Sequence, residues 1–156
     1  MTSPLSLLLR LPQCISGAAS LEAAVMMPFV ISLMVGSTDF GLAFAVSSTA
    51  DKSVRDAARY LARVPSGAIC GWGLTNAKNL AVYGELTVSA GDQPLIPNWS
   101  TSDITLTLPT DCTALPSPTV IRLDATVPFT GIMLGAIGLS NAITMHAQHE
   151  ERFIGE

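Results

Sequence analysis

The longest apolar stretch of the chain lies between Glu22 and Asp51, where Asp39 is the single charged residue among 28. A helix needs about 20 predominantly apolar residues to cross a bilayer, so this stretch predicts a membrane-spanning helix. The alternative is a buried core helix, but a remaining chain of about a hundred residues could hardly enclose a helix that is apolar on all sides. We therefore expect this segment to lie in lipid.

After Asp51 the apolar stretch gives way to an amphipathic pattern. In "DKSVRDAARYLARV" apolar residues gather on one helical face and basic residues on the opposite one: Val54, Ala58 and Leu61 against Lys52, Arg55, Arg59 and Arg63. Pro65 and the two residues after it end the helix, which would run some forty residues from Glu22. We interpret the basic face as solvated; the alternative is contact with lipid headgroups or an acidic neighbour.

The distal half of the chain alternates between apolar and polar residues, which is typical of half-buried strands. Three stretches show the pattern clearly: residues 104–108, 121–127 and 143–148. A weaker fourth lies at 86–90, after a short helix at 75–82 that Gly84 would end. These elements predict an antiparallel sheet covered by the apolar face of the long helix, and thus an α+β fold.

Composition supports a membrane protein and excludes nucleic-acid binding. The chain is 49% hydrophobic and 13% charged, which is apolar for a soluble domain of 156 residues. It has 12 acidic residues against 8 basic ones, for a formal charge of −4. Most of the basic residues precede Lys78, so no extended cationic surface is available for a nucleic acid.

The sequence lacks the motifs that would carry catalysis or bind a cofactor. It contains no Walker loop, dinucleotide-binding fingerprint or nucleophile elbow. His146, His149 and Glu150 lie close together, but on a strand the two His would point to opposite faces, and no third ligand follows at motif spacing. We predict no catalytic residue, no metal site and no cofactor.

The first 17 residues, "MTSPLSLLLRLPQCISG", place the features of a leader in an unusual order. The one basic residue, Arg10, follows the short apolar run instead of preceding it, and the long apolar stretch comes after the small residues. This order does not suit signal peptidase I. It suits a prepilin leader, which ends in Gly and leaves the apolar helix on the mature protein, so we predict cleavage between Gly17 and Ala18.

Several landmarks follow one another in a recognisable order: Gly17, Glu22, "AAVMMPFVISLMVGSTDFG" and "STADKSVRDAARYLA". Together they resemble the amino-terminal half of TadE/TadF-like minor pseudopilins of tight-adherence (Tad/Flp) pili, and "VIRLDATVPFTGIMLGAIGLSNAITMHAQHEER" is similar to the end of that family. Ala18 stands where major pilins have an aromatic residue, which favours a minor component. The resemblance implies a prepilin-type leader at 1–17, a transmembrane and extended amphipathic helix at 18–64, and a periplasmic α+β domain at 65–156.

The resemblance also implies a protein that works by assembly and not as an enzyme. It would act in assembly or initiation of a Tad pilus for surface adherence. Its partners would be a prepilin peptidase, other Tad pilins, inner-membrane assembly proteins and membrane lipid. The alternatives are a type II secretion pseudopilin and a membrane-anchored periplasmic binding or enzymatic domain with an uncleaved amino terminus.

Two acidic residues are candidate assembly residues, because an acid within a membrane usually marks a functional partner. Cleavage would create an α-ammonium on Ala18, which we expect to pair with Glu22 of a neighbouring subunit; the alternative is an interfacial acid at a helix start. For Asp39 we expect a contact with another transmembrane helix or assembly protein, or a position near the outer headgroups. We interpret "GIMLGAIGL", at 131–139, as a buried connection or a docking surface for a partner pilin.

Orientation depends on two conflicting signals. Four basic residues after the span against Arg10 before it would place the carboxy-terminal domain in the cytoplasm. Removal of the leader, however, takes away Cys14 and leaves an even pair, Cys70 and Cys112, which we expect to form a disulfide. The alternative is two buried thiols in a reducing compartment. Together with the order of the leader, the pair favours a single-pass inner-membrane protein with a periplasmic domain.

Overall fold

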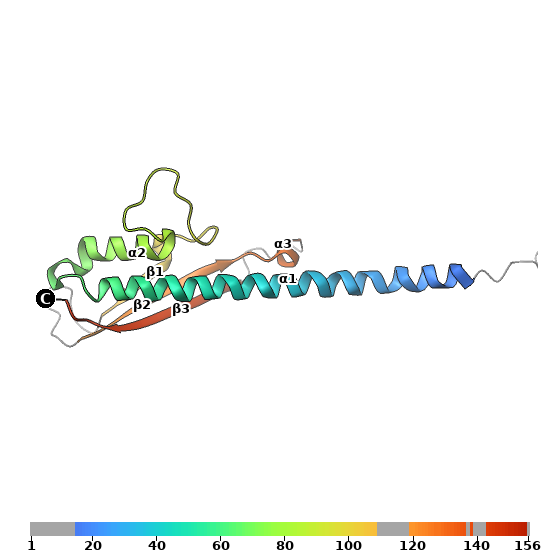
Figure 1. Ribbon diagram of the computed structural model, residues 1–156, viewed down its shortest axis with the longest axis horizontal. Helices are drawn as coiled ribbons and strands as arrows, with labels where there is room; N and C mark the ends of the chain where they lie inside the picture. Colours follow the sequence, from blue (N-terminus) through green and yellow to red (C-terminus); the bar gives the residue numbers. More distant parts are fainter. Residues whose placement is uncertain (1–14, 109–118, 137, 139–142, 156) are drawn as a thin grey trace, which may run out of the picture. The chain divides into compact units, whose positions relative to one another are not determined.

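The computed structural model describes residues 15–108, 119–136, 138 and 143–155. Figure 1 shows the long helix α1, two shorter helices and three strands: α1 (Ile15–Leu61), α2 (Leu74–Tyr83), β1 (Ile104–Thr107), β2 (Val120–Phe129), α3 (Ile132–Ala136) and β3 (Ile143–Arg152). The predicted α+β class is confirmed, since a long apolar helix precedes a three-stranded antiparallel sheet. The chain divides into two units, residues 1–38 and 39–156, which are described separately.

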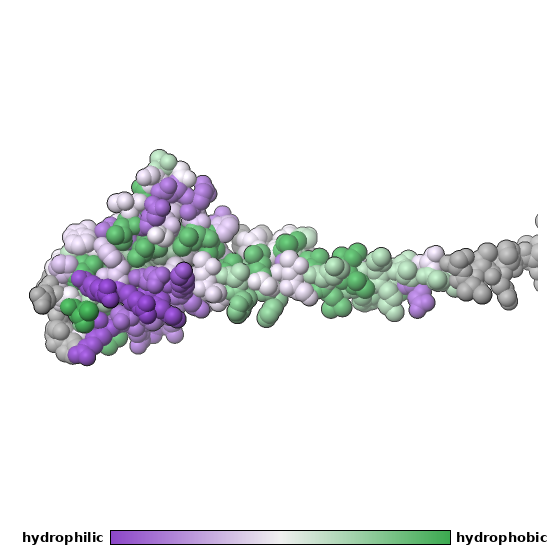
Figure 2. Space-filling model, in the orientation of Figure 1, coloured by the Kyte–Doolittle hydropathy of each residue, from purple (hydrophilic) through white to green (hydrophobic). Residues whose placement is uncertain are grey.

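The described part of the first unit is the amino-terminal half of α1. Its large apolar side chains are exposed, from Leu21 to Met34, and Figure 2 shows a largely hydrophobic surface here. Its hydroxyl groups donate to carbonyls of the same helix, as Ser32 does to Pro28 at 2.7 Å and Thr38 to Met34 at 3.0 Å. Because these polar groups are satisfied locally, the segment can enter hydrocarbon without unpaired donors. Among the described residues, α1 is the one helix long and apolar enough to cross a membrane.

In the second unit, the distal half of α1 supplies one side of the core. Its apolar face is buried: Ala50, Val54, Ala57, Ala58 and Leu61 are each at most 1% exposed. Its basic side chains Lys52, Arg55 and Arg59 are exposed, as is Arg63 in the turn that follows. The predicted amphipathic helix is therefore confirmed on both faces. The helix ends at Leu61, before Pro65.

The sheet has the order β1-β2-β3 and is antiparallel throughout. Leu106 of β1 lies opposite Leu123 of β2, and Ala125 of β2 lies opposite Ala147 of β3. Along β2 the buried side chains alternate with more exposed ones: Ile121, Leu123, Ala125, Val127 and Phe129. The first four of these residues and the apolar face of α1 belong to one hydrophobic core. The three clearly patterned strands are thus confirmed.

The helix predicted at 75–82 is confirmed as α2. It ends where predicted, at Gly84, which adopts a left-handed conformation with φ 79° and donates its N–H to the Leu80 carbonyl at 3.0 Å. The strand predicted at 86–90 is wrong. Residues 85–92 are exposed, and Leu86 and Val88 have no facing strand in the described sheet. Because no strand of the described sheet pairs with residues 86–90, this segment is a loop despite its alternating pattern.

Candidate interaction surfaces

The predicted cleavage point lies in the first turn of α1. The helix begins at Ile15, so Gly17 and Ala18 are helical in this chain, and most of the predicted leader falls outside the described residues. Glu22 follows about one turn later with an exposed side chain, and it forms no ion pair with any residue that the structure describes. Cleavage after Gly17 and the assembly role of Glu22 stay predictions.

Asp39 has partners within its own chain. Its Oδ1 accepts the backbone N–H of Ile132 at 2.6 Å, and its Oδ2 accepts that of Met133 at 2.8 Å. These are the first amides of α3, which lack helical acceptors, and a carboxylate is the preferred group there. Figure 1 shows α3 beside α1. The sequence suggested a partner in another protein or in the headgroups, and the intrachain contact was missed.

Gly131 explains how Asp39 can approach so closely. A Cβ atom at this position would lie 2.8 Å from Oδ2 of Asp39 and 3.0 Å from its Cγ. Gly131 is buried, whereas Ile132 is 59% exposed and Ala136 is also exposed. The segment 131–139 was interpreted as a buried connection or a docking surface. Over its described residues, only the start is buried and an apolar side remains open.

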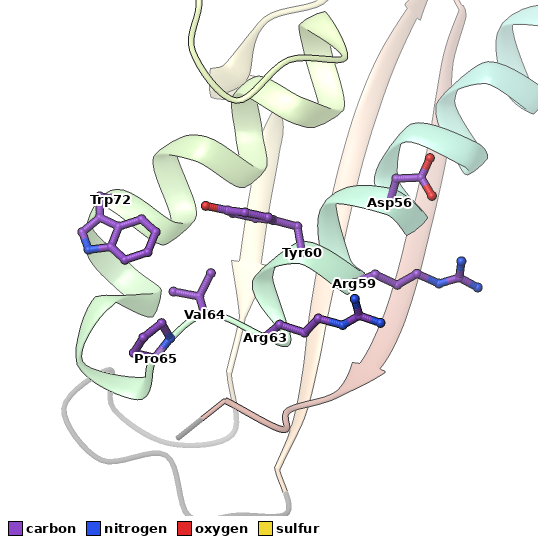
Figure 3. A pocket seen from close by; sticks show the side chains of 7 residues that line it. All are labelled: Asp56, Arg59, Tyr60, Arg63, Val64, Pro65 and Trp72. Carbon is purple, nitrogen blue, oxygen red and sulfur yellow. The ribbon is translucent and has the colours of Figure 1, made fainter.

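A shallow groove of about 520 Å³ opens at the end of α1. Figure 3 shows its lining residues: Asp56, Arg59, Tyr60, Arg63, Val64, Pro65 and Trp72. The guanidinium groups of Arg59 and Arg63 point away from Trp72, which is 55% exposed, so the charges do not converge on one ligand position. The Tyr60 hydroxyl accepts a hydrogen bond from Asn76 at 3.2 Å. The groove therefore agrees with the interpretation of a solvated basic face.

The outer face of β2 and β3 carries a polar ladder centred on Arg122. Its Nε lies 2.8 Å from Asp124 Oδ1, its Nη1 lies 3.8 Å from Glu150, and Gln148 accepts a further hydrogen bond from Nη2. The hydrogen bond to Asp124 and the charge of that carboxylate raise the pKa of the Arg122 guanidinium. Within the described ranges, no group of three His, Cys, Asp or Glu side chains could hold a metal ion. The ladder is a cross-strand structural contact.

Cys70 lies half-buried against the core, just after the turn that follows α1. Its sulfur forms a disulfide. Cys112 lies outside the described residues, so the pairing of Cys70 with Cys112 stays a prediction.

Residues 17–59 match the family model described as TadE-like protein. The long helix is similar to TadE-like proteins. The match confirms the resemblance of the amino-terminal segment, which contains Glu22, Asp39 and much of the basic face, and it does not extend to the carboxy-terminal stretch. Among the described residues, the one amino-terminal apolar helix is consistent with a single-pass membrane anchor. Comparisons with curated proteins and with solved structures gave no match.

Proposed function

We propose that this chain is a minor pilin or pseudopilin that acts in assembly or initiation of a Tad pilus for surface adherence. The observation that carries the proposal is the TadE-like match over residues 17–59, which covers the whole apolar span together with Glu22. The exposed apolar surface of the same segment supports it, because a helix with no cover in the described chain needs lipid or neighbouring helices around it.

In this proposal a prepilin peptidase removes residues 1–17 and leaves an α-ammonium on Ala18. A charged acid within a membrane helix is costly, and an opposite charge offsets part of that cost. Glu22 of one subunit would pair with the Ala18 ammonium of the next, which directs docking in the membrane. The subunit would then leave the bilayer with other Tad pilins, helped by inner-membrane assembly proteins.

The domain at 65–156 is proposed to lie in the periplasm, joined to the anchor and extended helix at 18–64. The predicted pair of Cys70 and Cys112 supports this orientation, because disulfides persist in oxidising compartments. The leader order supports it as well. Against it stands the basic face of α1, which by the positive-inside rule would favour the cytoplasm.

The proposal is tested by deleting the gene and counting pili by electron microscopy, with the wild-type gene and the Gly17→Val variant as the two complementing alleles. A side chain at the cleavage position should block the peptidase, so Gly17→Val should leave Met1 on the accumulated protein and fail to restore pili. Intact mass spectrometry of the purified wild-type protein should begin at Ala18. Normal pili in the deletion strain, with Met1 retained on the wild-type protein, would reject the pilin role and favour an anchored periplasmic domain. A secretion defect with normal pili would instead indicate a type II pseudopilin.

A further inference from the structure

The position of Asp39 along α1 sets the level of α3 relative to a membrane. Asp39 follows Glu22 by 17 residues in the sequence, and none of the 16 residues between them is charged. A helix crosses the hydrocarbon core of a bilayer with about 20 predominantly apolar residues. If the span begins at Glu22, its length therefore puts Asp39 near its carboxyl end.

Asp39 also fixes α3 at that level. The two hydrogen bonds from its carboxylate to the Ile132 and Met133 amides tie the start of α3 to this turn of α1. Gly131 packs directly on the same carboxylate. The acid is thus provided with two backbone donors, which lowers the cost of holding it near hydrocarbon.

Apart from Asp39 itself, the surfaces at this level are apolar and carry no formal charge. The sequence has no Asp, Glu, Lys or Arg between Asp124 and Glu150, and none between Asp39 and Asp51. Ile132 is 59% exposed on α3, while Phe40 and Phe44, one turn apart on α1, are 77% and 72% exposed. Beyond this level the character changes, since Lys52, Arg55 and Arg59 line the exposed face of α1 and Arg63 is exposed in the turn after it. The second unit is therefore apolar around α3 and the start of its α1 segment, and charged farther along α1. This change in polarity matches that across a bilayer interface.

We propose that α3 is a second membrane contact, whose exposed side enters the boundary between headgroups and acyl chains at the carboxyl end of the α1 span. Phe40 and Phe44 occupy the same layer from α1. The lipid surface is favoured over a second copy of the chain because α3 is tied to the turn at which the span reaches that surface. The contact depends on the membrane span of α1 and not on pilus assembly.

The test measures the depth of single tryptophans in the full chain, reconstituted in phosphatidylcholine vesicles. The parent carries Trp72→Phe, so that buried Trp99 gives a constant background. Ile132→Trp reports on α3, and Ile154→Trp is the matched control, since Ile132 and Ile154 are 59% and 61% exposed. A nitroxide on a shallow acyl carbon of the lipid should quench the Ile132→Trp variant several-fold more strongly than the Ile154→Trp variant.

Equal quenching at these two positions would overturn the proposal. Protection of the Ile132→Trp variant from both the lipid label and aqueous iodide would overturn it too, by indicating a protein partner. Ala136→Trp gives a second reporter on α3 in case Ile132→Trp fails to fold. Phe29→Trp, at a position within the span that is 66% exposed, shows separately whether α1 itself enters the membrane. If a nitroxide on a deep acyl carbon does not quench Phe29→Trp, the membrane anchor fails as well as the α3 contact.

Discussion

The carboxylate of Asp39 accepts the backbone N–H of Ile132 at 2.6 Å, although the two residues are 93 positions apart. The contact joins the first turn of the second unit to the connection between β2 and β3. It places a negative charge at the start of α3, where free amides and the helix dipole favour it. Asp39 thereby determines where the apolar connection lies, whatever other partners it has in a membrane.

Asp39→Ala should release the start of α3. The substitution removes both acceptor oxygens, and a hydrogen bond to a charged group contributes about 1.5–3 kcal/mol, so the Ile132 and Met133 amides should exchange with solvent about 10-fold to 150-fold faster. Hydrogen exchange read by mass spectrometry or NMR measures this. Asp39→Asn keeps one acceptor oxygen and should give an intermediate rate. Unchanged exchange in Asp39→Ala would show that α3 is held by other contacts.

Gly131→Ala should disturb the same contact from the other side. The new Cβ would lie 2.8 Å from Asp39 Oδ2, so either the carboxylate or the connection must move, at a cost of about 1–3 kcal/mol. Gly135→Ala, four residues later within α3, is the matched control, because a Cβ there meets nothing within 4 Å. It should be neutral or slightly stabilising. Thermal unfolding of both variants in detergent gives the comparison, and equal effects would contradict the steric argument.

The elements that could be predicted from sequence are those in which apolar residues recur at a regular spacing because one face is buried. Val54, Ala58 and Leu61 recur at helical spacing because one face of α1 meets the sheet, and β2 alternates because one face meets α1. The stretch 86–90 alternates in the same way but lies exposed, so alternation alone did not decide whether a neighbouring strand exists.

The contacts that could not be predicted join residues far apart in the sequence. The groups that make them do not recur at a regular spacing, so no sequence pattern indicates them. Asp39 bonds to backbone amides, and every residue except proline has one, so nothing in the sequence of α3 identifies the partner. Gly131 was considered only as part of the apolar segment 131–139, whereas the structure shows the Asp39 carboxylate packed against it. The same limit applies to Phe153, whose burial depends on where the chain returns after β3.

Phe153→Ala should strongly destabilise the second unit. Phe153 is 1% exposed, and its N–H donates to the Thr119 carbonyl at 2.7 Å, so the residue closes the core after β3. Truncating a buried Phe costs about 3–5 kcal/mol. Ile154→Ala is the control next to it, since Ile154 is 61% exposed and its backbone bond to Ala62 would remain; we expect a change within about 0.5 kcal/mol. Urea unfolding followed by Trp99 fluorescence measures both, and similar midpoints would refute the role of Phe153.

Glu22→Gln should impair piliation while leaving the protein folded and processed. The amide keeps the shape of the side chain but loses its charge, so the proposed Ala18 ammonium of a neighbour would stay unpaired in a low-dielectric setting. Pilus counts and intact mass give the two readouts. Glu85→Gln removes an exposed acid from the loop after α2 and should leave both unchanged. Normal pili in Glu22→Gln would reduce Glu22 to an interfacial acid at a helix start.

Cys70 and Cys112 should form a disulfide in the mature protein, and Cys14 should take no part because it leaves with the leader. The closed loop, Cys70 through Cys112, holds 43 residues. On the chain-entropy model this loop contributes about 4 kcal/mol, a large share of the stability of a small domain. The bridge would tie the turn after α1 to the segment between β1 and β2.

Alkylation of the native mature protein before and after reduction tests the bridge. We expect no reactive thiol before reduction and two after it. Cys70→Ser, Cys112→Ser and the double variant should lose similar stability, because either single change already opens the loop. Additive losses, or two thiols that react before reduction, would reject the bridge. The second result would also favour a cytoplasmic domain, the orientation that the four basic residues of α1 indicate by charge alone.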